Sequence, residues 1–136
     1  MRDGHAITLT TRSRNTVGYR QLLEAIAAAN PTGDLYLISD NLSSHKSPPI
    51  PEWLAKNPRV RHLFIPVGAC WVNLQEAWWR IFRRSVFAGQ IFADAGEIDR
   101  ATAVATKQLN ARAQPWVWGR PQRPPRVLRH SYVYRI

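Results

Sequence analysis

Cysteine is almost absent from this sequence, which holds only Cys70 among its 136 residues. A single cysteine excludes an intramolecular disulfide framework and a zinc site built from cysteine pairs, and it fits a reducing compartment. Long apolar runs are also missing, because no stretch approaches the ~20 residues of a membrane-spanning helix. Residues 1–15 lack the apolar core of a secretory signal. We therefore expect a soluble cytoplasmic protein with no membrane partner.

Acidic residues are scarce as well. The chain has 9 Asp and Glu against 19 Lys and Arg, a formal net charge of +10, and no acidic residue follows Asp99. Arg and Lys displace the counterions condensed on a phosphate backbone, so this imbalance favours a nucleic-acid partner. A merely solvated basic surface, or a ribosome-like structural protein, remains the alternative.

Apolar periodicity predicts an α/β fold. The strands are expected over residues 6–11, 35–38 and 60–66, and the helices over 15–29, 53–56, 74–85 and 97–112. The first strand alternates apolar and polar residues and should be half exposed, whereas the continuous apolar run at 35–38 is typical of a buried parallel strand. The connection from 38 to 60 is long enough for a crossover, so the second and third strands should pair in parallel.

Two acidic residues stand out by their position. Asp40 ends an apolar strand, at the edge where open α/β sheets place ligand groups, and Glu76 lies in the first turn of the helix after the next strand. Two carboxylates converging there are suitable ligands for a divalent cation. Structural roles remain open, because Asp40 can start an Asx turn and Asn73 and Glu76 have the spacing of a capping box.

Two motifs carry a family resemblance. Residues 37–46 (LISDNLSSHK) resemble the second-aspartate motif of mariner-like and related bacterial insertion-sequence transposases of the DDE superfamily: an apolar strand, Asp-Asn, then a His four residues after the Asn. Residues 66–76 (PVGACWVNLQE) resemble the third motif, in which Trp-Leu-Asn precedes the final acid, with Val72 here in place of Leu. The 35 residues between Asp40 and Glu76 match the short spacing of this family.

The resemblance implies a ribonuclease-H-like fold with a two-metal site for phosphoryl transfer on DNA, using Mg²⁺ or Mn²⁺. Asp40 and Glu76 would be the catalytic metal ligands, Asn41 and His45 would orient substrate or the carboxylates, and Asn73 would cap the helix that presents Glu76. The family's first Asp belongs on the opening strand and has no match in this sequence. We therefore expect a partial ribonuclease-H-like fold without its opening strands, and little or no catalysis by this chain alone.

The resemblance also assigns the partners: DNA, as transposon ends and target, together with a second copy of the chain or a complementing N-terminal transposase half. In a bacterial cell, the DNA-bound protein would be associated with the nucleoid. The residues expected to contact DNA are basic: Lys46, Arg80, Arg83, Arg84, Arg120, Arg123 and Arg126. Trp78 and Trp79 are expected in the core.

Two segments are expected. Residues 1–112 would form the C-terminal part of a DDE transposase catalytic domain, and residues 113–136, rich in Arg, Pro and aromatics, an extended arm. The leading hypothesis is a fragment of a transposase that cleaves and transfers DNA strands. The alternatives are a non-catalytic DNA-binding remnant that competes with full-length transposase, and a basic RNA-binding structural protein.

Overall fold

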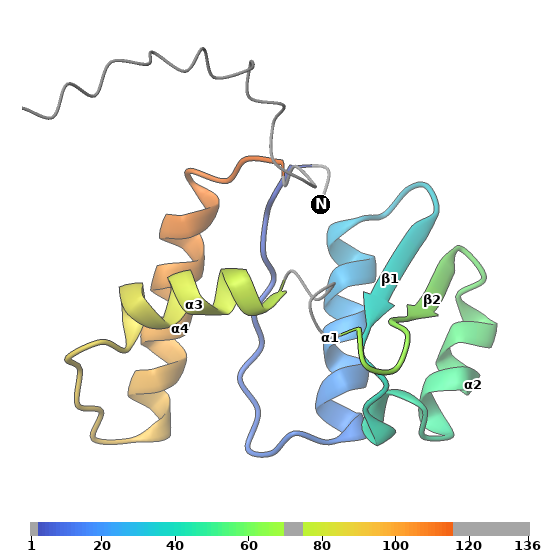
Figure 1. The fold of residues 1–136 in the computed structure, drawn as a ribbon, viewed down its shortest axis with the longest axis horizontal. Coiled ribbons are helices and arrows are strands. Elements are labelled where there is room, and N and C mark those ends of the chain that lie inside the picture. Colours follow the sequence, from blue (N-terminus) through green and yellow to red (C-terminus); the bar gives the residue numbers. More distant parts are fainter. Residues whose placement is uncertain (1–2, 70–74, 116–136) are drawn as a thin grey trace, which may run out of the picture.

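The computed structural model describes residues 3–69 and 75–115, and these residues form two helical units joined by extended chain (Figure 1). The first unit contains a two-stranded sheet with helices α1 (Thr16–Ala29) and α2 (Pro49–Lys56), and the second contains α3 (Gln75–Val86) and α4 (Ala95–Asn110). The predicted mixture of helix and parallel strand is confirmed.

The sheet pairs strand β1 (Leu35–Ser39) in parallel with β2 (Val60–Phe64), with Leu35 opposite Val60 and Ser39 opposite Phe64. The 3₁₀ turn η1 (Ser43–His45) and α2 form the crossover between the strands. Parallel strands place their carboxyl ends at the same edge, so the residues that follow Ser39 and Phe64 are brought together.

Helices α1 and α2 cover one face of this sheet. Leu23 of α1 and Ile50 of α2 are 1% and 0% exposed, and they pack with Trp53 and Val60 in the first hydrophobic core. The opposite face is open, because Tyr36 is 59% exposed. The prediction that the run 35–38 is buried on both sides is therefore wrong: its burial alternates along the strand, as expected when helices cover a single face.

Helix α1 begins and ends where the sequence predicts. The side chain of Asn15 accepts a hydrogen bond from the Gly18 amide at 2.9 Å, the usual N-cap geometry. At the other end, the side-chain amide of Asn30 donates to the Ile26 carbonyl at 2.9 Å, and Pro31 follows. Polar side chains therefore satisfy backbone groups at both ends that the helix itself leaves unpaired.

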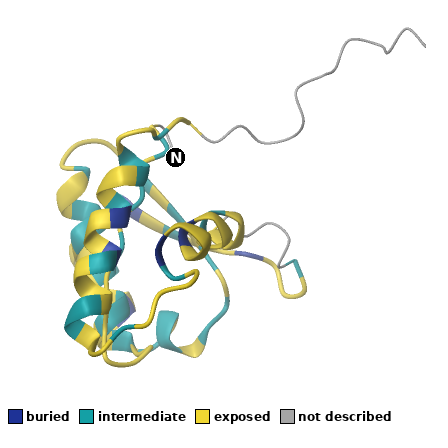
Figure 2. Cartoon of the chain, turned by 90° about the vertical axis from the view of Figure 1, so that its left-hand side faces the viewer, coloured by how far each residue is buried: buried dark blue, intermediate teal, exposed yellow. Residues whose placement is uncertain are grey.

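A second hydrophobic core joins α3 to α4. Phe82 is fully buried, and Val86 and Ala105 are each 7% exposed beside it. Asp94 caps α4, since its carboxylate accepts from the Glu97 amide at 2.8 Å. Val104, on the same helix, is 57% exposed. Trp79, expected in the core, is 40% exposed. Buried residues form only small clusters among a largely exposed surface (Figure 2).

The predicted strand at residues 6–11 is not a strand in the structure. Among the described residues it has no neighbouring strand, and side chains of α4 form hydrogen bonds with its backbone and hydroxyl groups instead. Asn110 exchanges two hydrogen bonds of 2.9 Å with the backbone of Ala6, and the hydroxyls of Thr8 and Thr106 lie 2.7 Å apart. This arrangement leaves Ile7 38% exposed.

Candidate active site

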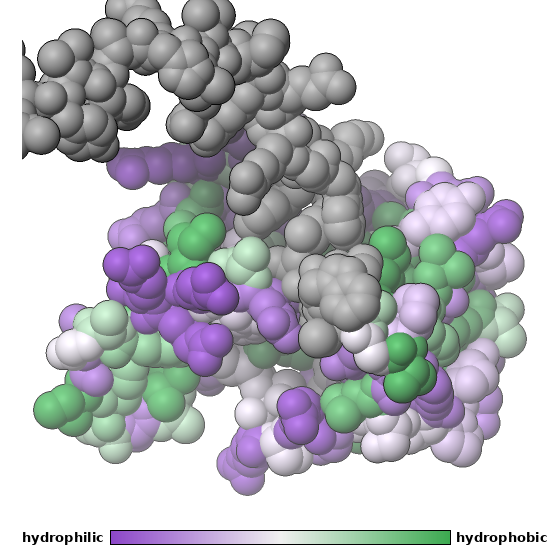
Figure 3. Space-filling model, in the orientation of Figure 1, coloured by the Kyte–Doolittle hydropathy of each residue, from purple (hydrophilic) through white to green (hydrophobic). Residues whose placement is uncertain are grey.

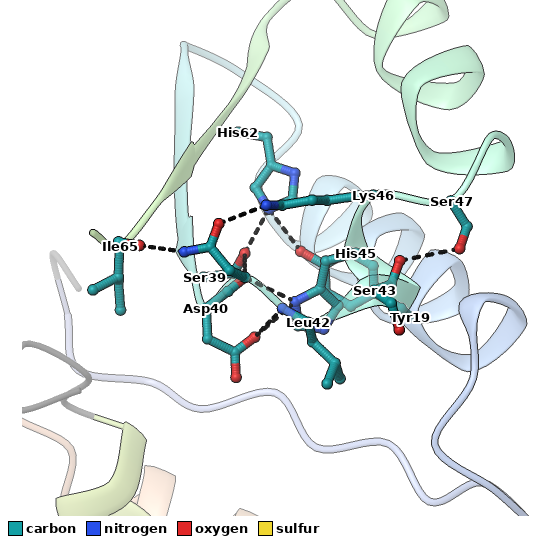
Figure 4. A network of polar contacts seen from close by, with 11 residues as sticks. Tyr19, Ser39, Asp40, Leu42, Ser43, His45, Lys46, Ser47, His62 and Ile65 are labelled. Carbon is teal, nitrogen blue, oxygen red and sulfur yellow. Dashed lines mark hydrogen bonds and ion pairs between the residues drawn. The ribbon is translucent and has the colours of Figure 1, made fainter. Parts of the chain in front are cut away.

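Asp40 lies directly after β1, at the carboxyl edge of the sheet (Figure 4). One carboxylate oxygen accepts from the Leu42 amide at 3.3 Å, so the Asx turn considered from the sequence is present. The same oxygen lies 3.0 Å from Nδ1 of His45. The side chain is still 58% exposed, and its other oxygen has no hydrogen-bond partner among residues 3–69 and 75–115. The local turn therefore orients the carboxylate without covering it.

His45 is held in place by a stack and by its contact with Asp40. Its ring lies 3.8 Å from the Tyr19 ring, centroid to centroid, at an interplanar angle of 26°. The His45 side chain is only 15% exposed, and Nδ1 also lies 3.3 Å from the Asp40 carbonyl oxygen. Both acceptors of Asp40 thus face Nδ1, which favours the tautomer with the proton on that nitrogen.

A second histidine connects this turn to the sheet. Nε2 of His62, on β2, lies 2.7 Å from the Ser39 hydroxyl and 3.0 Å from the Tyr19 hydroxyl. Burial lowers the pKa of His62, and the neighbouring His45 lowers it further. Burial likewise raises the pKa of Tyr19. This network therefore favours a neutral imidazole and a protonated phenol.

Asn41 joins the ends of the two strands. Its side-chain NH₂ donates to the Ile65 carbonyl, just beyond β2, and its side-chain oxygen accepts from Lys46 Nζ at 2.7 Å. The Lys46 ammonium also lies 4.8 Å from the centroid of the Phe64 ring. The structure thus brings four of the predicted residues together at one edge: Asp40, Asn41, His45 and Lys46.

Glu76 lies in the first turn of α3, as predicted, at the end of the helix nearest the sheet (Figure 1). Its side chain lines a groove with Trp79, Arg80, Arg83 and Phe87. Within the described part of the chain, no hydrogen bond or ion pair joins Glu76 to Asp40, so their convergence stays a prediction. Asn73, Arg120, Arg123 and Arg126 lie outside the described residues.

The model of one protein family, the DDE superfamily endonucleases, matches residues 1–99. The chain belongs to this family. The DDE assignment made from the two motifs is therefore confirmed, and the matched range contains the whole Asp40 edge together with Glu76.

One curated relative of this DDE endonuclease chain is the insertion element IS630 uncharacterized 39 kDa protein of Shigella sonnei. The two are 38% identical over 50 residues, which is 37% of this chain and 15% of the relative. The insertion-sequence type inferred from the motifs is therefore supported, whereas the match covers only a small part of the relative. No solved structure matches the chain.

The donor chemistry of this DDE chain suits a divalent cation in part. Carboxylate oxygens are the ligands that Mg²⁺ prefers, and Asp40 offers an exposed, oriented oxygen. In the two described ranges, however, no three His, Cys, Asp or Glu side chains are gathered closely enough to hold an ion together. Asp40 and Glu76 therefore fit as a partial ligand set rather than a complete one.

Three residues of the network were not predicted from the sequence: Tyr19, Ser39 and His62. Only His62 left a signal, because it interrupts the apolar strand 60–66 at a position that faces inward.

None of the described helices is long and apolar enough to cross a membrane.

Proposed function

We propose that this chain is part of an insertion-sequence DDE transposase that cleaves DNA and joins strands in a metal-dependent reaction. The proposal rests mainly on the Asp40 carboxylate. This chain belongs to the DDE family, and it holds Asp40 at the carboxyl edge of β1 with one oxygen oriented by His45 and the other exposed. Family membership makes a phosphodiester the reacting group, and the edge position suits a ligand site.

The expected cofactor is Mg²⁺ or Mn²⁺, bound by Asp40 and Glu76. When bound, such ions polarise the scissile phosphate and lower the pKa of the attacking hydroxyl or water. The chain's own contribution is to orient Asp40: the Nδ1–H of His45 donates to it, and the Tyr19 ring holds the imidazole. Asn41 and Lys46 keep the ends of β1 and β2 together beside it.

The third carboxylate of the triad would come from polypeptide other than these 136 residues, either a complementing transposase half or another chain. Support comes from the sequence, in which no acidic residue before Asp40 lies in a motif that matches the family's first Asp. Within this proposal, residues 1–112 supply the C-terminal part of a ribonuclease-H-like domain, and residues 113–136 an arm that contacts DNA. The chain alone is then expected to show little or no cleavage.

Metal binding tests the proposal directly. Mn²⁺ titrated into the ¹⁵N-labelled chain should broaden the amide signals near Asp40, because the ion is paramagnetic, and should raise the melting temperature. A ligand present at about 100 times its Kd stabilises the folded state by about 2.7 kcal/mol. Asp40→Asn and Glu76→Gln should each lower the affinity for Mn²⁺ by about tenfold or more. Removal of a residue that only supports a metal ligand already costs about 10–100-fold in affinity.

Asp34→Asn is the matched control. Asp34 precedes β1 at the opposite end of the strand, is 54% exposed and faces Arg61 at 3.9 Å. Asp34→Asn removes the same charge beside the opposite end of β1 and should leave the Mn²⁺ response unchanged. An equal loss in all three variants, or no Mn²⁺ response at all, would contradict the two-carboxylate site.

A non-catalytic DNA-binding regulator is the second candidate, because the family's first Asp has no match in this sequence while its basic character remains. Salt-sensitive DNA binding without any Mn²⁺ response would support this role. Cleavage restored by adding a polypeptide that carries the missing acid would instead support the divided enzyme.

A further inference from the structure

Strand β1 has a free edge in the part of the chain that the structure describes, because its sheet has only two strands. The Leu35 amide donates to the Arg59 carbonyl at 2.8 Å, at the start of the ladder with β2. Odd-numbered residues of β1 therefore face β2, and the backbone groups of Tyr36 and Ile38 point to the free edge. A row of such groups can pair with a further strand.

The side chains along β1 are also incompletely covered. Tyr36 and Ile38 are 59% and 51% exposed on the open face of the sheet, where hydrophobic side chains gather over the two strands (Figure 3). On the other face, Leu35 and Leu37 are only partly buried beside the first hydrophobic core. A strand added at this edge would therefore bury apolar surface on both faces of the sheet.

Two exposed acids mark the ends of this edge. Asp34 precedes β1 and is 54% exposed, and Asp40 follows β1 and is 58% exposed. Arg61 approaches Asp34 only to 3.9 Å, and His45 contacts a single oxygen of Asp40. The two acids are six positions apart in the sequence, so a strand with basic residues at the same interval would match both.

Residues 128–136 (LRHSYVYRI) have this pattern. Their two arginines, Arg129 and Arg135, are also six positions apart, and the segment contains no glycine or proline. In an extended chain one face would carry neither arginine and would be mainly apolar and aromatic: Leu128, His130, Tyr132, Tyr134 and Ile136. Aromatic and β-branched residues favour strands. The segment lies outside the described residues.

We propose that residues 128–136 bind along the free edge of β1 in the same chain, as a third strand whose two arginines lie beside Asp34 and Asp40. The equal intervals define the register, and a slip by one residue would turn every side chain to the opposite face. In this register Tyr132 lies beside Leu37 whether the added strand is parallel or antiparallel to β1. The aromatic face then extends the first hydrophobic core.

The connecting residues allow this contact within one chain. The described chain ends at Pro115, at the end of the molecule where α1 ends and β1 begins (Figure 1). Residues 116–127 can span up to about 40 Å when extended. A tether of this length keeps the segment at an effective concentration of the order of millimolar, which favours it over the same segment of a second copy. The arginines expected to contact DNA remain in the connection: Arg120, Arg123 and Arg126.

Amide hydrogen exchange of the full chain in EDTA tests the pairing without metal or DNA. The amides of Tyr36 and Ile38 should exchange at least about tenfold more slowly than unpaired amides. Tyr132→Pro and Val133→Pro are the informative variants, because proline removes an amide donor and neighbouring residues of a strand point their amides to opposite edges. At least one of the two should return Tyr36 and Ile38 to the fast rate.

Gln122→Pro is the matched control, since it makes the same change in the connecting residues and should leave both rates unchanged. The Leu35 amide, which is paired with Arg59, reports whether each variant is folded. Unprotected Tyr36 and Ile38 amides in the wild type, or protection that neither strand variant removes, would overturn the proposal. Protection that disappears on dilution would show that the strand comes from a second copy, and would overturn the contact within one chain.

Charge reversal tests the register. Arg129→Glu and Arg135→Glu should each reduce the protection of β1 severalfold, whereas Arg126→Glu, outside the segment, should not. Asp34→Arg should restore protection when combined with Arg129→Glu if the added strand is parallel, or with Arg135→Glu if it is antiparallel. Restoration by neither pair would overturn the register.

The added strand would also affect the metal site, and this consequence alone rests on the proposed function. An arginine beside Asp40 opposes binding of a cation there, so the proline variant that releases the strand should bind Mn²⁺ severalfold more tightly than the wild type. If exchange shows the strand released and the affinity for Mn²⁺ is unchanged, the pairing stands and the competition does not. If no Mn²⁺ binds to any variant, the metal site fails alone, because the exchange experiment needs no metal.

Discussion

The ring of Tyr19, on α1, lies flat against the ring of His45, on η1, with their centroids 3.8 Å apart. This stack links the first helix of the chain to the turn that carries Asp40. The Tyr19 hydroxyl separately contacts His62 at 3.0 Å. One residue therefore supports both histidines of the site, by its face and by its hydroxyl.

Two substitutions at Tyr19 separate these roles. Tyr19→Phe keeps the stack and removes the hydroxyl contact, so it should lower the free energy of unfolding by about 1 kcal/mol. Tyr19→Leu also removes the stack, whose aromatic contribution is about 0.5–1.5 kcal/mol, and should be the more destabilising. Urea unfolding measures both changes.

The Tyr19 variants should also differ in the state of His45. In NMR spectra of the imidazole, Tyr19→Phe should leave the His45 ring signals close to those of the wild type, whereas Tyr19→Leu should shift them. If both variants shift these signals equally, the hydroxyl rather than the stack positions His45.

The lowered pKa of His62 predicts a pH-dependent stability. Burial disfavours the imidazolium, so in the folded state His62 binds its proton below the ordinary value of 6.5, which the unfolded chain retains. Neutral His62 therefore contributes stability that is present above about pH 6.5 and is lost as the pH falls through the lowered folded-state value. His62→Gln cannot titrate, so the difference in stability between wild type and variant should shrink as the pH falls from 7.5 to 5.5. A difference that is constant across this range would contradict the prediction.

We expect a negative charge at position 41 to lower the stability of the fold. Its NH₂ group donates to the Ile65 carbonyl, so Asn41→Asp would place two acceptors face to face across the strand ends. Removal of one partner of a part-buried hydrogen bond costs about 1–3 kcal/mol, and we expect a loss of that size in urea unfolding. Asn41→Ser, which keeps a donor but shortens the reach, should lie between Asp and wild type. A neutral Asn41→Asp would show that the Ile65 contact contributes nothing to stability.

Local rules predicted the ends of α1 and the start of α4 because their end signals lie in adjacent residues, whereas α2, expected over 53–56, begins at Pro49, since proline is compatible with the first turn of a helix. The caps Asn15 and Asp94 and the stop at Asn30 are each read within four residues of the helix they bound. The parallel pairing also followed from the length of the connection alone. The Asp40 turn was predictable for the same reason, since its Asx bond spans two residues.

What the sequence could not predict depends on contacts between distant residues. Tyr19 and His62 are 43 positions apart, and no spacing rule relates them. The alternation in residues 6–11 resembled a strand, yet a strand needs a partner, and α4 supplies side chains there instead. Likewise, the open face of β1 could not be read from a run of apolar residues that would suit either a covered or an uncovered sheet.

Arg59 provides a test of how the sheet is joined to α1. Its guanidinium donates to three backbone carbonyls at the end of α1 and in the turn beyond it: Ala27 at 2.8 Å, Asn30 at 2.6 Å and Gly33 at 3.3 Å. The Ala27 carbonyl also accepts from the Asn30 amide at 3.3 Å, whereas the Asn30 and Gly33 carbonyls lie beyond the helix, so the charged fork supplements a long bond and satisfies groups that α1 does not pair. Hydrogen bonds to charged groups contribute about 1.5–3 kcal/mol each to stability, although the parts of a single fork do not add independently.

We expect Arg59→Ala to lower the free energy of unfolding by about 2–3 kcal/mol and Arg59→Lys to recover only part of it, because an ammonium cannot span three acceptors in a plane. Arg61→Ala is the control: Arg61 lies two residues further along, is 61% exposed and faces Asp34 at 3.9 Å. An exposed pair of this kind is worth at most about 1 kcal/mol. If Arg59→Ala and Arg61→Ala have equal effects in urea unfolding, then β2 is held to α1 by the hydrophobic core rather than by the guanidinium. Amide hydrogen exchange at Asn30 would then be unchanged in Arg59→Ala, whereas the fork predicts that the C-terminal turn of α1 exchanges faster.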